Sequence, residues 1–168
     1  MLQSPGFTRP LHPGEEVSAD RLLRLSYDSD AKAGLVRALR KSGAMAGEMV
    51  LPYDDQIIGY YVLSAMIQPK GWLCLAAVAI HPDWQGQRHG KRMIGQLAEW
   101  ARLSGVHVVA TDAHEFLMRA GFSQTRAAGL TSPLSPADIT LAGPGRDAPQ
   151  QALRFPKPFG LSWCGCFF

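Results

Sequence analysis

The segment Leu73-Cys-Leu-Ala-Ala-Val-Ala-Ile80, continued by His81-Pro-Asp-Trp-Gln-Gly-Gln-Arg-His-Gly90, decides the fold. Its first half is an uninterrupted apolar run, which predicts a buried strand. Its second half carries glycine and basic residues and leads into a pattern with helical spacing from about Arg88, which Gly105 is placed to end. The apolar positions with that spacing are Met93, Ile94, Leu97, Ala98 and Ala101.

A strand that passes through a glycine-bearing turn into a helix favours an anion site. The first helical turn has N–H groups without intrahelical partners, and the helix dipole is positive at this end. Gly86 and Gly90 would let a ligand approach the backbone, and Arg88, Lys91 and Arg92 add positive charge. A structural turn that holds no ligand is the alternative interpretation.

At these residues the chain resembles the GNAT superfamily of N-acetyltransferases, and within it the predicted N-acyltransferase branch. The acetyl-CoA motif of that superfamily reads Gln/Arg-x-x-Gly-x-Gly/Ala and follows a strand that ends before a proline. Gln85 and Gly90 match the motif, while Arg88 occupies the position of its first glycine. If this position requires a positive φ, the arginine side chain costs on the order of 1 kcal/mol.

Further family features follow in the expected order. The superfamily commonly ends its core with an aromatic residue, a tyrosine, three residues and Gly-Phe, which correspond here to Phe116, Leu117 and Gly121-Phe122. That tyrosine usually donates a proton to the departing CoA thiolate, and Leu117 has none to give. The tail Phe155-Pro-Lys-Pro-Phe159 matches the branch, and the resemblance is best over residues 17–122.

The resemblance implies an α/β fold, a GNAT-like mixed sheet with a splayed central strand pair and flanking helices. It also implies acetyl-CoA as co-substrate, with the backbones of Val78 and Ile80 bonded to the pantetheine amides. The residues expected to hold the pyrophosphate through their amides are Gln85, Gly86, Gln87, Arg88, His89, Gly90 and Lys91.

The implied chemistry is direct attack of an amine on the thioester carbonyl. A main-chain N–H of the central strand can stabilise the oxyanion. A general base is also needed, but residues 73–80 lack the glutamate that the superfamily often places on this strand. The candidates are His81, Asp112, His114 and Glu115, each of which also suits a cap or a solvated surface. We assign no catalytic residue from the sequence.

The rest of the chain completes the predicted element order. We expect a short strand at 7–10, a helix from about 18 to 27, and a second helix ended by Gly43. An antiparallel hairpin follows, with strands at 44–51 and 57–67 and a turn at 52–56. After the motif helix come a strand at 106–110 and a short helix. Residues 127–168 form a loop-rich segment with at most short strands, for example at 139–141.

Length and composition narrow the class of protein. The 168 residues predict one domain, residues 1–168, and the 46% hydrophobic and 18% charged fractions are typical of soluble globular proteins. No apolar run reaches the roughly 20 residues that a membrane helix needs. The net charge is +3, and the sequence lacks the dense run of Lys and Arg that is typical of a nucleic-acid binder. The N-terminus has no secretion signal, so we expect a cytoplasmic protein.

The chain has 3 cysteines, and none suggests a metal site. Cys74 lies in the apolar strand and is expected to be a buried, inert thiol. Cys164 and Cys166 lie in an apolar tail, and the sequence shows no second pair of metal ligands to go with them. We therefore expect this tail to dock on its own domain or on a partner subunit. The sequence is compatible with a homodimer and does not fix the oligomeric state.

The leading hypothesis is an acetyl-CoA-dependent N-acetyltransferase whose acceptor is an amine of a small molecule or a protein. The alternative is a CoA-binding module without transferase activity, which the leucine at 117 and the missing strand glutamate favour. A P-loop enzyme fits poorly, because the loop from Gly86 to Lys91 is one residue too short and Arg92 replaces the magnesium-binding Ser/Thr.

Overall fold

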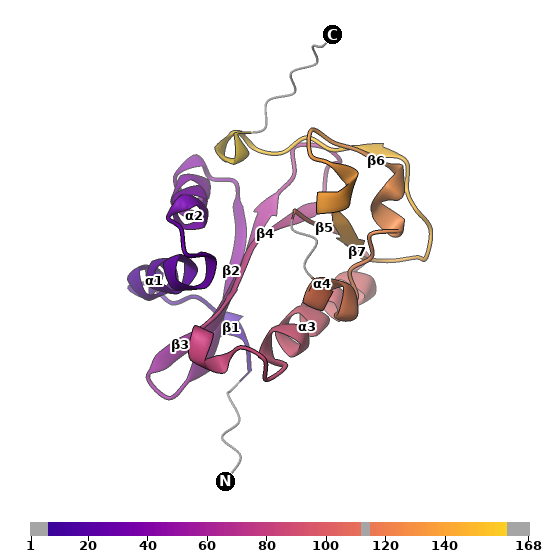
Figure 1. Ribbon diagram of the computed structural model, residues 1–168. Helices are drawn as coiled ribbons and strands as arrows, with labels where there is room; N and C mark the ends of the chain where they lie inside the picture. The colour runs from indigo at the N-terminus through magenta and orange to yellow at the C-terminus, as the bar shows by residue number, and fades with distance from the viewer. Residues whose placement is uncertain (1–6, 112–114, 161–168) are drawn as a thin grey trace.

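The computed structural model describes residues 7–111 and 115–160, and its central feature is a six-stranded mixed sheet (Figure 1). The strand order is β1-β2-β3-β4-β5-β7, in which β4 and β5 are parallel and the other neighbours are antiparallel. The strands are β1 (Arg9–Pro10), β2 (Met45–Tyr53), β3 (Gln56–Ala65), β4 (Leu73–Ile80), β5 (Val108–Ala110) and β7 (Thr140–Ala142). The mixed α/β fold predicted from the sequence is confirmed.

Helices cover both faces of this sheet. On one face, α1 (Glu16–Tyr27) and α2 (Ala31–Ser42) pack over Tyr60 and Val62 of β3. On the other face, α3 (His89–Ser104) and α4 (Glu115–Arg119) pack over Tyr61 and Leu63. This division follows from the period of two in a strand, which sends successive side chains to opposite faces.

The later part of the chain is built from short elements. A small parallel pair joins β6 (Leu130–Thr131) to β8 (Gln151–Ala152), and 3₁₀ turns lie at Arg126–Gly129, Pro136–Asp138 and Lys157–Phe159. The short strand expected near 139–141 is β7, which extends the main sheet beside β5.

The predicted helix ends are confirmed. Gly43 ends α2 with φ 79°, and Gly105 ends α3 with φ 71°. Both residues adopt the left-handed conformation that glycine reaches without a Cβ penalty. The first helix begins at Glu16, before the predicted start at residue 18.

The predicted hairpin is present, but its turn is shorter than the expected five residues. Tyr53 pairs with Gln56, so only Asp54 and Asp55 remain outside the strands. Asp54 has φ 50°, and aspartate tolerates this conformation better than most residues. Pro52 lies inside β2 at a register shift, a place where a residue without an N–H fits a strand.

The central strand pair is splayed, as expected. The parallel pairing of β4 with β5 covers only Leu73–Leu75 against Val108–Ala110. Ala76 has no paired residue on β3, because the register shifts between Val62 and Leu63. Past this irregularity, no described strand accompanies β4 on its β5 side as far as Ile80. The two strands therefore part and leave an open edge on β4.

Within the described residues, no helix combines the length and the apolar character that a membrane crossing requires. Cys74 is a fully buried free thiol, as predicted. Cys164 and Cys166 lie outside the described residues.

Candidate active site

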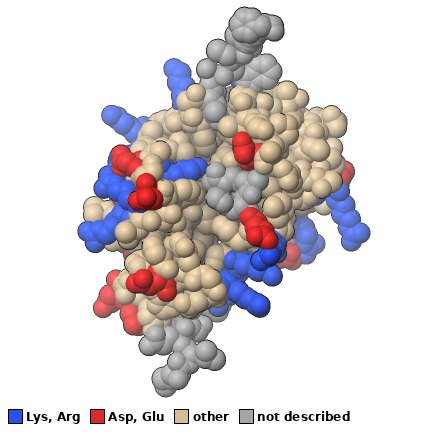
Figure 2. Space-filling view, in the orientation of Figure 1, with Lys and Arg blue, Asp and Glu red and all other residues tan. Residues whose placement is uncertain are grey.

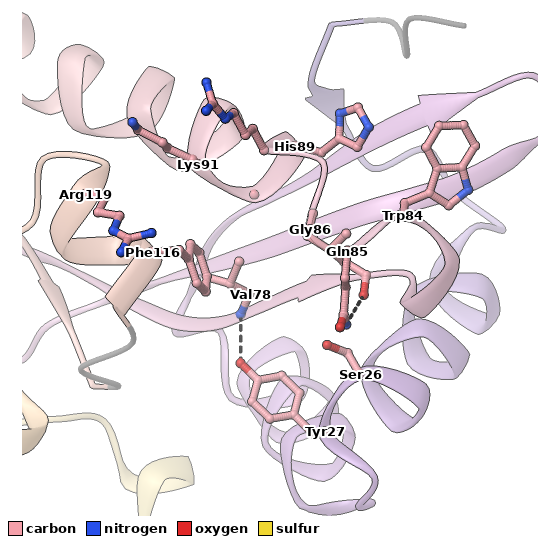
Figure 3. Close-up of a pocket in the computed structure, with 13 residues that line it drawn as sticks. Ser26, Tyr27, Val78, Trp84, Gln85, Gly86, His89, Lys91, Phe116 and Arg119 are labelled. Atoms are coloured by element: carbon pink, nitrogen blue, oxygen red, sulfur yellow. Dashed lines mark hydrogen bonds between the residues drawn. The ribbon is translucent and has the colours of Figure 1, made fainter.

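A cavity of about 650 Å³ opens beside the splayed part of β4 (Figure 3). Its walls come from the end of α1, the open edge of β4, the turn before α3, the first turn of α3, and α4. The residues that line it are Ser26, Tyr27, Val78, Ile80, Trp84, Gln85, Gly86, Arg88, His89, Gly90, Lys91, Phe116 and Arg119.

The structure brings together the residues that the sequence selected. All of the predicted cofactor-binding residues line this cavity except Gln87. The Gln87 side chain instead donates a hydrogen bond to the Asp83 carbonyl oxygen at 3.3 Å. Ser26, Tyr27, Trp84 and Arg119 line the cavity as well, and sequence analysis did not select them.

Side chains from three different segments bind the open edge of β4. The Val78 N–H donates to the Tyr27 hydroxyl at 3.1 Å, and the Lys32 ammonium donates to the Ala76 carbonyl at 3.0 Å. The Gln85 amide donates to the Ile80 carbonyl at 2.9 Å. A strand edge that faces the interior needs such partners, because unpaired backbone groups are costly there.

The Gln85 side chain therefore holds the shape of the turn. It ties the turn back to the end of β4, and Gly86 follows with φ 77°. Tyr27 and Lys32 also contact each other, with the ammonium 5.5 Å from the centroid of the ring. These two residues come from α1 and the start of α2, and of the two only Tyr27 is among the described lining residues of this cavity.

Arg88 adopts the left-handed conformation that a glycine would favour. It precedes α3 as its N-cap with φ 66° and ψ 11°, and its carbonyl accepts the first helical hydrogen bond from Arg92 N–H at 3.0 Å. This position therefore has the positive φ that strains a residue with a Cβ. A Cβ in this region costs roughly 1–2 kcal/mol, so the turn is strained at the residue that departs from the motif.

Charge at the cavity is positive. Arg88, Lys91 and Arg119 line it, and Figure 2 shows basic side chains gathered over the start of α3 and over α4. Among the described lining residues there is no aspartate or glutamate. Arg119 also pairs with Glu115 on the exposed side of α4. A helix N-terminus with this surrounding charge fits a polyanion such as a pyrophosphate.

His89 adds a polar ring that is mostly neutral near pH 7. Burial lowers its pKa, and the nearby Arg92 lowers it further. The ring lies 5.6 Å from that of Trp84, measured between centroids. Its buried Nε2 has no hydrogen-bond partner among the described residues.

The short helix α4 presents Phe116, and not Leu117, to the cavity. Leu117 is 1% exposed and belongs to the core formed with α3. Phe116 lies opposite Tyr27 across the Val78 backbone (Figure 3). A Cβ built on Gly90 would lie 3.7 Å from the Phe116 ring and 3.4 Å from the Ile80 side chain, so Gly90 keeps this side of the cavity open.

The two candidate bases within the described residues, His81 and Glu115, do not line the cavity. The Nδ1 of His81 accepts from the Asp83 N–H at 3.1 Å and caps the turn at Pro82–Trp84. Glu115 pairs with Arg119. Asp112 and His114 lie outside the described residues. No described cluster of three or more His, Cys, Asp or Glu residues could hold a metal ion.

A second cavity of about 440 Å³ adjoins the same region. Lys32, whose ammonium binds the Ala76 carbonyl, is one of its lining residues, and Thr111 directly follows β5. Its remaining lining residues are Ala31, Gly34, Leu35, Leu134, Pro158 and Phe159.

Comparison with known proteins identifies relatives of this fold and sequence. A sequence model of the acetyltransferase (GNAT) family matches residues 17–122. An uncharacterized N-acetyltransferase YhbS of Escherichia coli strain K12 is 33% identical over 86 residues, which are 49% of this chain. The match spans about half of that relative, 52% of its length.

Solved structures resemble nearly the whole chain. The E. coli YhbS structure in complex with CoA has a TM-score of 0.76 at 22% identity and covers 95% of this chain and 96% of its own. A GNAT family acetyltransferase from Brucella melitensis in complex with acetyl-CoA has a TM-score of 0.75 at 20% identity, with 94% and 99% covered. At these identities the likeness establishes the fold.

Proposed function

The chain belongs to the acetyltransferase (GNAT) family, and from that premise we propose that it transfers an acetyl group from acetyl-CoA directly to an amine. The observation that carries the proposal is the 650 Å³ cavity, which joins the open edge of β4 to the positively charged start of α3. One end suits an extended amide-containing arm and the other suits phosphates.

In this proposal the two ends of the cavity have separate roles. Backbone groups of Val78 and Ile80 bind the pantetheine arm at the edge of β4. Amides between Gln85 and Lys91 hold the pyrophosphate, and the Arg88 and Lys91 side chains balance its charge. Structural neighbours bound to CoA and to acetyl-CoA support this use of the fold.

The acceptor is an amine of a small molecule or a protein, and we propose that it enters through the 440 Å³ cavity. That cavity reaches the open edge of β4 through Lys32, where an attacking nitrogen could meet the thioester. Leu35, Leu134 and Phe159 give it apolar walls, which suit an acceptor with an apolar body next to its amine.

Calorimetric titration with acetyl-CoA and with CoA tests the cofactor. The native protein should bind both in the micromolar range, and Gly90→Gln should lose binding because the new side chain fills the space beside Ile80 and Phe116. Gly95→Ala is the matched control on the same helix, because a Cβ there meets nothing closer than the Ala120 carbonyl oxygen at 3.9 Å. A folded native protein that binds neither ligand would refute the proposal.

Turnover separates transfer from binding alone. Release of CoA thiol from acetyl-CoA should depend on an added amine, assayed with primary amines such as benzylamine and with a peptide bearing a free N-terminus. Tight binding of CoA without amine-dependent release across such a panel would favour the CoA-binding module instead.

A further inference from the structure

We propose that Tyr27 is the proton donor to the sulfur that leaves acetyl-CoA, an inference that rests on the proposed function. It is a residue of α1, remote in sequence from the motif, and it reaches the cavity at the open edge of β4.

The position of the hydroxyl group carries the argument. Tyr27 Oη accepts the Val78 N–H at 3.1 Å, at the backbone group that the proposed function assigns to the pantetheine arm (Figure 3). A donor arm bound along this edge competes for that N–H. Its reactive end and the Tyr27 hydroxyl therefore meet in the same part of the cavity.

In its hydrogen bond with Val78, the Tyr27 hydroxyl is the acceptor. The Tyr27 oxygen uses a lone pair to accept the Val78 N–H, so this bond does not consume the hydroxyl proton. Among the described lining residues, Tyr27 is the only phenol, and the arginine and lysine side chains belong to α3, the turn before it, and α4. Leu117, at the position where the family has its usual donor, is buried in the core.

Lys32 supports the charge that the step creates. Its ammonium lies 5.5 Å from the centroid of the Tyr27 ring and is fixed by the Ala76 carbonyl at 3.0 Å. A positive charge held at this distance favours a ring that has given up its proton. The pair comes from two helices that pack on the same face of the sheet.

In the proposed step the acetyl group passes from sulfur to nitrogen. The amine nitrogen forms a bond to the thioester carbon, and the carbon–sulfur bond breaks with its electron pair moving to sulfur. Tyr27 gives its hydroxyl proton to that sulfur, so CoA leaves as a thiol. The nitrogen loses a proton to water, and the tyrosinate recovers one from water.

The first test needs no acceptor, because it follows the thiol of bound CoA. The thiolate is detected by its ultraviolet absorbance as pH is raised. In the native complex a Tyr27 hydrogen bond stabilises the thiolate, and Tyr27→Phe should raise the pH midpoint of ionisation by about 1. Arg88, Lys91 and Arg119 act on the thiol equally in both proteins, so the difference isolates the hydroxyl. An unchanged midpoint would overturn the proposal.

The second test separates kcat from binding. With acetyl-CoA and the best amine of the panel, Tyr27→Phe should lower kcat by about 100-fold, while the dissociation constant of CoA stays within about threefold. Tyr53→Phe is the matched control, since Tyr53 packs on Trp84 and does not line the cavity. A kcat within threefold of native, or a parallel loss of CoA affinity, would each refute a donor role.

Failure of the proposed function and failure of the proposed role of Tyr27 give different experimental results. Absence of CoA binding by the native protein refutes the proposed function. If the native protein binds CoA and transfers acetyl groups, while Tyr27→Phe behaves like Tyr53→Phe, only the role of Tyr27 is refuted. Tighter CoA binding by Tyr27→Phe without a loss of kcat would assign Tyr27 to covering the strand edge.

Discussion

Replacing Arg88 with glycine should make the protein more stable, although it removes a charge beside the proposed phosphate site. Arg88 precedes α3 with φ 66°, a conformation that strains any residue with a Cβ. Glycine adopts it freely. The same substitution restores the glycine that the family motif has at this position.

The expected change in the free energy of unfolding is the difference between two opposing effects. Relief of the left-handed strain contributes about 1–2 kcal/mol, and the greater freedom of glycine in the unfolded chain costs about 0.4–1 kcal/mol. The net gain in the free energy of unfolding is about 0.8 kcal/mol, which raises Tm by about 2–3 °C for a chain of this length.

Arg88→Ala is the matched control for the backbone effect. Alanine removes the guanidinium but keeps the Cβ, so the strain remains and the stability should stay near that of the native protein. Urea denaturation and thermal unfolding of the three proteins measure the difference. If Arg88→Gly is no more stable than Arg88→Ala, the left-handed strain at this turn is refuted.

The two variants should behave alike toward CoA. Arg88 is exposed, and an exposed ion pair contributes at most about 1 kcal/mol, so each variant should weaken binding by no more than about fivefold. The loss should shrink as salt is added, because salt screens exposed charges. A far larger loss shared by both variants would mean that the guanidinium grips the phosphate directly.

Two further predictions concern the core and the histidines. Leu117→Tyr should lower the free energy of unfolding by about 2–4 kcal/mol, because it overpacks a fully buried site and buries a hydroxyl. Phe116→Tyr at the cavity wall should lower it by less than about 1 kcal/mol. Urea denaturation measures both losses, and equal losses would contradict the assignment of Leu117 to the core and Phe116 to the cavity. Burial lowers the pKa of His89 and of His107, so the folded state resists their protonation. Stability should therefore fall as pH drops below about 6.5, and His107→Gln should flatten this fall in urea titrations between pH 7.5 and 5; an unchanged slope would contradict it.

The sequence predicts the strand, turn and helix around residues 73–105 because the determinants are local. An apolar run, a glycine turn and helical spacing all lie within one segment, so their order specifies the local structure. The same local pattern also predicts almost all of the residues that line the cavity from the turn before α3 and from the first turn of α3. The predicted turn at 52–56 is too long because Pro52, a residue type that often marks a turn, lies inside β2 at a register shift.

The opposite wall of the cavity could not be predicted in this way. Tyr27 lies 51 residues from Val78 in sequence, and no local pattern distinguishes a tyrosine at the end of an amphipathic helix from an ordinary packing residue. Which face of α4 meets the core is also a tertiary matter. The motif places residue 117 at the cofactor, whereas packing against α3 buries it and presents Phe116.

The contacts along β4 also indicate where binding energy comes from. The Val78 N–H already has a partner in Tyr27, and the Ile80 carbonyl has one in Gln85. A ligand arm at this edge exchanges hydrogen bonds, and an exchange yields a net gain well below the strength of an isolated bond. The amides that begin α3 have no intrahelical acceptor, and they lie beside two cations, Arg88 and Lys91. Affinity for CoA should therefore reside mainly at the phosphate end, while the edge of β4 sets the position of the thioester. This division explains why a substitution at Gly90 tests binding, whereas one at Tyr27 tests the chemical step.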